Sequence, residues 1–168
     1  YTILNLDKAK GNQTQFWMDN FLGLKPIQNE YKHTQDWISL TDSFVKESLV
    51  EETVPTERMD IMNRAKDYFK DAETFKQEEF ESAVLQEEPV IQSFRTYNND
   101  YKLAHEVELE EEFEISNQAV KKQNKVFKSV LKLDKNFHIY VHGNRDLIER
   151  GEEQDGRKYY KLYYENEE

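Results

Sequence analysis

The sequence contains no cysteine, and glycine and proline are scarce, with five and three residues among 168. The absence of cysteine excludes disulfide bonds, thiolate zinc sites and cysteine nucleophiles, and it is compatible with a reducing cytoplasm. The glycines form neither a GxxxxGK[ST] phosphate loop nor a GxGxxG fingerprint, and no serine lies in a GxSxG motif. The residues therefore predict no enzyme activity, no cofactor and no small-molecule substrate.

Long apolar runs are also missing. No stretch approaches the roughly 20 apolar residues that span a bilayer, and the opening "YTILNLDKAKGNQ" lacks the apolar core of a signal peptide. We therefore expect no membrane contact and a cytoplasmic location. The chain begins at Tyr1 in what reads like the middle of a strand. We expect it to be the C-terminal part of a longer protein whose N-terminal domain is absent.

Aromatic residues and charged residues are abundant. The chain has ten phenylalanines, ten tyrosines and two tryptophans, while charged residues make up 34%. Disordered segments are poor in aromatic residues, so most of this chain is expected to fold, and its length suits one domain. Aromatic side chains are expected to supply much of the core.

The charge is unevenly distributed along the chain, whose net charge is −11. Residues 1–116 contain 12 basic and 25 acidic residues, whereas residues 117–168 contain 11 and 9. We interpret 1–116 as an acidic helical body and 117–168 as a locally basic, β-rich segment packed on it, within one domain. The acidic run Glu106–Glu114 is interpreted as a solvated strand or linker rather than a pair of catalytic carboxylates.

Six stretches in the first three quarters of the chain carry apolar residues at helical spacing. They cover residues 9–23, 33–49, 54–69, 74–85, 89–104 and 117–127. Thr34 and Ser116 suit N-caps, and Pro55 suits a first helical turn. Thr74 and Gln77 have the spacing of a capping box. The helix at 89–104 is expected to pack along Val90, Phe94, Tyr97, Tyr101 and Ala104.

From Lys128 onward the apolar period changes to two, which predicts strands. The stretch Phe137–His142 alternates Phe137, Ile139 and Val141 toward a core with His138, Tyr140 and His142 on an open face. A later stretch, "KYYKLYY", alternates in the same way and follows Asp155-Gly156, a strong hairpin signal. The predicted fold class is α+β: a helical body followed by a small C-terminal antiparallel β-sheet.

His138 and His142 raise the question of a metal site. Two histidines four residues apart are neighbours on a helix, but on a strand they lie about 13 Å apart. A zinc ion needs both nitrogens at about 2 Å, so one strand cannot chelate it with this pair. We therefore interpret the two histidines as polar positions on an open strand face and predict no metal.

Basic residues are concentrated within 117–145, where seven of them are opposed only by Asp134. They are Lys121, Lys122, Lys125, Lys128, Lys132, Lys135 and Arg145. Cations beside aromatic residues suit contact with a nucleic-acid backbone and, if strands are open, with bases. The alternative is a solvated face whose charge is balanced by Glu149, Glu152 and Glu153.

Two stretches carry a family resemblance. "KGNQTQFWMDNFLG", residues 10–23, joins a lysine-glycine pair to an aromatic-rich helix that ends in Phe-Leu-Gly. The end of the chain is "FKSVLKLDKNFHIYVHGNRDLIERGEEQDGRKYYKLYYENEE". Both resemble the C-terminal portion of the NdpA-type bacterial nucleoid-associated proteins. The resemblance implies a bacterial nucleoid protein that binds double-stranded DNA and has no catalytic motif to carry over.

Two functions follow as hypotheses. In the first, the chain is a non-catalytic, nucleoid-associated DNA-binding protein, and its basic residues contact phosphates largely without reading sequence. In the second, it is a protein-interaction or self-association domain, and the missing N-terminal half carries the DNA binding. An enzyme that uses His138 or His142 with carboxylates is the least supported hypothesis.

Overall fold

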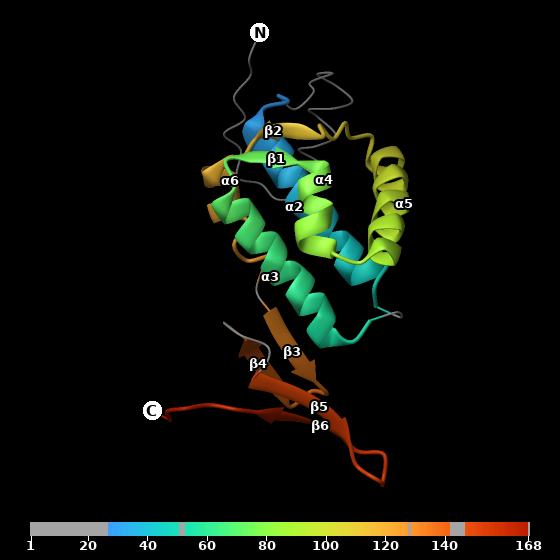
Figure 1. The fold of residues 1–168 in the computed structure, drawn as a ribbon, viewed down its shortest axis with the longest axis vertical. Coiled ribbons are helices and arrows are strands. Elements are labelled where there is room, and N and C mark those ends of the chain that lie inside the picture. Colours follow the sequence, from blue (N-terminus) through green and yellow to red (C-terminus); the bar gives the residue numbers. More distant parts are fainter. Residues whose placement is uncertain (1–26, 51–52, 128, 142–146, 168) are drawn as a thin grey trace.

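A computed structural model describes residues 27–167 apart from 51–52, 128 and 142–146. The helices are α2 (Glu30–Glu47), α3 (Pro55–Asp71), α4 (Gln77–Phe80), the π-helix η2 (Glu81–Leu85), α5 (Glu88–His105) and α6 (Asn117–Lys122). The strands are β1 (Thr74–Lys76), β2 (Glu112–Glu114), β3 (Ser129–Leu133), β4 (Phe137–Val141), β5 (Ile148–Glu152) and β6 (Lys158–Leu162). The fold class is α+β, as predicted: helices form one end of the molecule and the C-terminal hairpins the other (Figure 1).

Helices α2, α3, α5 and α6 confirm four of the predicted helical stretches, while the stretch at 9–23 lies outside the described residues. Pro55 occupies the first turn of α3, and the Ser116 side chain accepts a hydrogen bond from Ala119 N at the start of α6. On α5 the predicted packing seam is partly wrong. Ala104 is exposed, whereas Ile91 and Asn98 are buried beside Phe94.

Thr34 is not the N-cap of α2, which corrects the sequence prediction. The helix begins one turn earlier, where the Asn29 side chain accepts a hydrogen bond from Lys32 N at 3.0 Å. The buried Thr34 hydroxyl donates to Glu30 O at 2.7 Å and accepts from Ser116 N at 2.9 Å. Thr34 therefore joins α2 to the segment that precedes α6.

The predicted helix at 74–85 is confirmed from Gln77 to Leu85, as α4 and η2, but its start at Thr74 and the Thr74–Gln77 capping box are wrong. Residues 74–76 form β1, which pairs antiparallel with β2 so that Phe75 lies opposite Phe113. The helical turns start only at Gln77, and the side chain of Lys76 makes no cap hydrogen bond. The extended conformation is stabilised by burial of the Phe75 ring, whose centroid lies 4.4 Å from that of Trp37. Tertiary packing therefore overrides the local capping pattern.

The acidic run Glu106–Glu114 is a linker that ends in strand β2, as interpreted from the sequence. Its six carboxylate side chains are exposed, while Leu109 is buried. The backbone carbonyl of Glu110 accepts a hydrogen bond from Trp37 Nε1 at 2.8 Å. The run therefore attaches to the core through its apolar side chains and its backbone, and it leaves its charges in water.

The core is built largely from aromatic rings. Six of its aromatic side chains have no exposed surface: Trp37, Phe44, Phe69, Phe75, Phe80 and Phe94. Phe127 and Leu131, which lie after residue 116, are buried as well. The basic C-terminal segment therefore begins inside the helical core before its strands leave it.

The C-terminal strands form two separate two-stranded antiparallel ladders, β3–β4 and β5–β6, among the described residues. The turns are as predicted, with Gly156 at a φ of +84°. Figure 1 shows β3 leaving the helical body and running away from it. Leu131 reaches the core near α3, but Phe137 at the far end of the hairpin is 62% exposed. The prediction that Phe137 faces a core is therefore wrong, because none of the described helices or strands covers that end.

Candidate nucleic-acid interface

Three of the predicted DNA-binding lysines lie together on one short stretch. Lys121 and Lys122 form the last turn of α6, and Lys125 follows in the turns after it; all three are exposed. Ala119, one turn before Lys122 on the same helix, has no exposed surface. Helix α6 packs against α2, and the three lysine side chains remain exposed. We call these three residues the lysine cluster.

The positive charge of the lysine cluster is not neutralised by direct contacts. Within the described part of the chain, none of its three ammonium groups forms an ion pair with a carboxylate. Lys122 Nζ lies 5.4 Å from the centre of the Tyr31 ring, which is a cation–π contact. This contact orients one cation without removing its charge, so the cluster can still attract phosphate.

The other predicted DNA-binding residues are not gathered at this place. Lys135 is exposed in the turn between β3 and β4, beyond a strand that extends for about 16 Å. Lys132 lies in β3 opposite His138. Lys128 and Arg145 fall outside the described residues, as does His142. The described cations therefore form a cluster on α6 and a separate position at the tip of the hairpin.

Two of the cations of the hairpin β5–β6 lie close to carboxylates of the same hairpin. Arg157 Nε lies 2.7 Å from Asp155 Oδ2, and Lys161 Nζ lies 3.9 Å from Glu149 Oε2. The same Glu149 oxygen accepts a hydrogen bond from the Tyr163 hydroxyl at 2.8 Å, and this bond raises the pKa of Tyr163. Phosphate attraction is consequently weaker here than at the lysine cluster.

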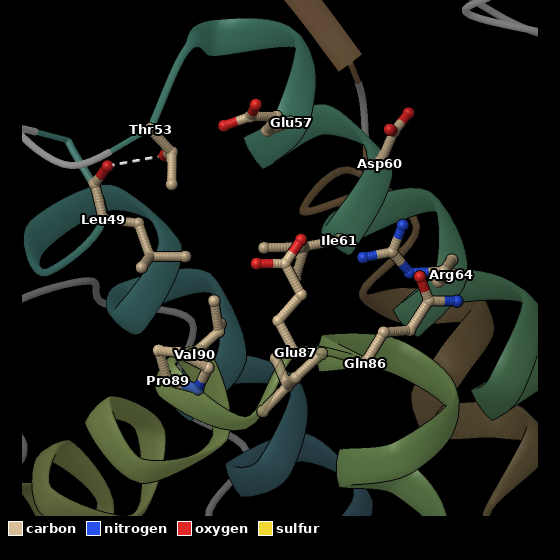
Figure 2. A pocket seen from close by; sticks show the side chains of 11 residues that line it. Leu49, Thr53, Glu57, Asp60, Ile61, Arg64, Gln86, Glu87, Pro89 and Val90 are labelled. Carbon is tan, nitrogen blue, oxygen red and sulfur yellow. Dashed lines mark hydrogen bonds between the residues drawn. The ribbon is translucent and has the colours of Figure 1, made fainter.

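A pocket of about 380 Å³ lies between α3, η2 and the start of α5 (Figure 2). Leu49, Ile61 and Val90 give it apolar walls, and Figure 2 shows the Glu87 side chain reaching into its middle. Glu57 and Asp60 add carboxylates, which would repel a nucleic-acid backbone. No residue of the lysine cluster lines the pocket. Its walls come from two separate stretches of the sequence, 49–64 and 85–90, so no local pattern could have predicted it.

A buried carboxylate, Glu81, was also missed. Its side chain is 2% exposed and accepts hydrogen bonds from Arg95 Nη2 at 2.6 Å and from Gln77 Nε2 at 2.7 Å. The hydrogen bond from Arg95 to the Glu81 carboxylate raises the pKa of Arg95 and joins η2 to α5. The group is a satisfied structural ion pair rather than an acid or base facing a ligand.

No group of three potential metal-ligating side chains lies together in the part of the chain that the structure describes. None of the described helices is long and apolar enough to cross a membrane. No curated protein and no solved structure matches the chain. Comparison with known protein families, in contrast, matches residues 1–157 to the family described as nucleoid-associated protein YejK. Because that match covers nearly the whole sequence, the chain belongs to this nucleoid-associated family, the same NdpA-type family that its two ends resemble.

Proposed function

We propose that this chain is the C-terminal part of a non-catalytic protein of the bacterial nucleoid, which binds double-stranded DNA through Lys121, Lys122 and Lys125. The observation that carries the proposal is an exposed lysine cluster, without ion-pair partners among the described residues, in a member of a nucleoid-associated family. The remaining basic residues, Lys128, Lys132, Lys135 and Arg145, extend the contact along the duplex. Because lysines position a phosphate backbone without reading base edges, binding is largely independent of sequence.

The acidic body determines how the duplex approaches. Residues 1–116 carry 13 more acidic than basic residues, so most of the helical surface repels phosphate. Residues 117–145 carry seven basic residues against one acidic residue. The duplex is therefore expected to approach from the side of α6 and β3–β4 and to leave the exposed carboxylates of Glu106–Glu114 in water. A one-sided charge of this kind limits the number of phosphate contacts, and the salt dependence of binding should be proportional to that number.

The test is a binding titration of the chain with an unrelated duplex at two salt concentrations, read by fluorescence anisotropy. Counterion release predicts that affinity falls as salt rises, with a log–log slope of about 0.9 per phosphate contact. Replacing the three cluster lysines by glutamate is expected to weaken binding at low salt by about tenfold or more. The same substitutions should reduce the slope by about three.

A matched control changes the same number of charges elsewhere. Lys46, Lys70 and Lys76 are exposed lysines of the acidic body, and Lys46 and Lys76 already pair with Asp42 and Glu79. Replacing these three by glutamate changes the net charge equally but leaves the cluster intact. Equal losses of affinity in both triple variants would show a net-charge effect and not a site. Absence of binding by the unmodified chain at low salt would assign DNA contact to another part of the protein.

A second candidate function, self-association, rests on a different observation. The C-terminal hairpins expose large apolar and aromatic side chains, among them Phe137, Tyr140 and Tyr164. Exposed aromatic residues are enriched at protein interfaces. Light scattering on the sample used for the titration separates a monomer that binds DNA from an oligomer.

A further inference from the structure

The hairpin β5–β6 exposes large apolar side chains on both of its faces. Leu162 is 48% exposed and Tyr164 is 69% exposed on one face, and Tyr163 is 47% exposed on the other. An isolated two-stranded hairpin is marginally stable in water and normally requires further strands or a covering layer. The described residues leave these side chains largely in solvent, so this hairpin presents an apolar surface.

The free edge of β6 has a defined set of backbone groups. Tyr163 N donates to Leu147 O at 2.8 Å, and Glu153 N donates to Arg157 O at 2.8 Å, so odd-numbered residues bond toward β5. Backbone groups alternate in direction along an antiparallel strand. The N–H and C=O groups of Tyr160, Leu162 and Tyr164 therefore point outward. Within the described part of the chain, no strand pairs with them.

The charge pattern of this hairpin suits a protein and not a nucleic acid. Residues 148–162 contain four cations and four anions: Arg150, Arg157, Lys158, Lys161, Glu149, Glu152, Glu153 and Asp155. A surface of balanced charge does not attract phosphate, but it can be complementary to itself. Self-complementarity is what a two-fold symmetric interface requires, because the same patch faces its own copy.

We propose that the free edge of β6 pairs antiparallel with the β6 of a second copy of this chain, around a two-fold axis at Leu162. This register places Leu162 opposite Leu162 of the second copy and Tyr160 opposite Tyr164 of the second copy, so these apolar side chains pack side by side across the new strand pair. On the other face this register places Lys161 opposite Tyr163 of the second copy. Just outside the strand, it places Arg157 opposite Glu167 of the second copy. Cross-strand pairs of these kinds are favourable.

Repulsion between like charges disfavours the neighbouring register. An axis one residue earlier would set Lys161 directly opposite Lys161 of the second copy, and like charges in that position destabilise a sheet. In the Leu162 register the outward N–H and C=O groups also form hydrogen bonds. Tyr160, Leu162 and Tyr164 of one copy, whose backbone groups point outward, lie opposite the same three residues of the second copy. The two hairpins then form one continuous sheet. The lysine cluster stays uncovered, since α6 and β6 lie at different ends of the molecule (Figure 1).

The absence of cysteine makes a direct crosslinking test possible. A single cysteine introduced by Leu162→Cys can form a disulfide only with another copy. Directly opposite hydrogen-bonded residues have Cα atoms about 5.5 Å apart, within the range that a disulfide spans. We expect Leu162→Cys to give mostly covalent dimer on a non-reducing gel after mild oxidation. Lys161→Cys on the same strand and Gln154→Cys in the hairpin turn are expected to remain mostly monomeric.

A second pair of variants tests the interface without a crosslink. Leu162→Lys sets two cations against each other at the proposed axis, while Gln154→Lys adds the same charge in the exposed turn. Sedimentation at several concentrations should show dimers for the unmodified chain and for Gln154→Lys, with the dissociation constant raised by about tenfold or more in Leu162→Lys. Far-UV circular dichroism checks that the helical body stays folded.

Two outcomes would overturn the proposal. One is a monomeric unmodified chain at every concentration at which it remains in solution. The other is equal crosslinking of the three cysteine variants, which indicates random collision and not a register. A DNA titration of Leu162→Lys distinguishes the pairing of β6 from DNA binding by the lysine cluster. The cluster is intact in this variant, so a single copy should still bind DNA.

Discussion

Replacing Trp37 by alanine is expected to lower the free energy of unfolding by about 4 kcal/mol, a large part of the total stability of a domain. The Trp37 side chain has no exposed surface, and its ring centroid lies 4.4 Å from that of Phe75 and 6.2 Å from that of Phe94. Truncation removes these contacts and leaves a cavity among rings from α2, β1 and α5. Urea denaturation followed by circular dichroism measures the loss.

Trp37→Phe is the control for this prediction, because it keeps an aromatic ring and removes the indole N–H. The lost hydrogen bond to Glu110 O and the smaller ring should together cost about 1–2 kcal/mol. A loss below about 1 kcal/mol in Trp37→Ala would contradict the full burial of Trp37 in the aromatic core.

Phe75→Ala is expected to cost a similar amount, about 4 kcal/mol, because the ring is fully buried. Phe75 has no exposed surface, and its ring centroid lies 4.9 Å from that of Phe113 on β2 and 5.7 Å from that of Phe69 on α3. Because Trp37 and Phe75 share contacts, the double alanine variant should lose less than the sum of the two single losses. The same urea titrations measure all three variants.

The matched variant for β1 is Thr74→Val, which keeps the β-branched shape and removes the hydroxyl. An N-cap hydroxyl contributes about 1 kcal/mol, whereas a strand tolerates valine. We expect a change within about 0.5 kcal/mol, because Thr74 pairs with Glu114 in the ladder and does not cap a helix. A loss of about 1 kcal/mol in the free energy of unfolding would instead indicate that Thr74 caps a helix, as the sequence predicted.

Periodicity predicted the helices because each buries a stripe of apolar residues on one side. The stripe of α2, including Trp37, Phe44 and Val45, lies at helical spacing and is buried as expected. Chain reversal was predictable for a similar local reason, since Gly156 adopts a positive φ that other residues rarely reach. These features depend on neighbours in the sequence, and so they can be read without the fold.

The wrong predictions concern residues whose conformation depends on distant partners. Thr74 has the spacing of a cap, but burial of Phe75 between α2 and α3 keeps the segment extended. Phe137 has the alternation of a core residue, but its hairpin extends past the helices. Alternation specifies that two sides of a strand differ, and it does not specify whether another layer covers either side.

For the candidate site, too, the sequence predicted some features, whereas others depend on tertiary packing. The sequence identified the basic segment and assigned Lys121, Lys122 and Lys125 to one helical stretch. Their exposure depends on how α6 packs against α2, two helices that are far apart in the sequence. The pocket beside Glu87 and the buried Glu81–Arg95 pair had no local signal, because their side chains come from separate elements.

The sequence by itself determined the family, the α+β class, the uneven charge and most helix boundaries, because each depends on residue types or on spacing within one segment. Only the tertiary structure decided that Thr74–Lys76 is a strand, that the lysine cluster stands apart from Lys135, and that the edge of β6 is open among the described residues. Those outcomes depend on which surfaces meet. Burial depends on how the whole chain packs, so the sequence of a single segment cannot predict it.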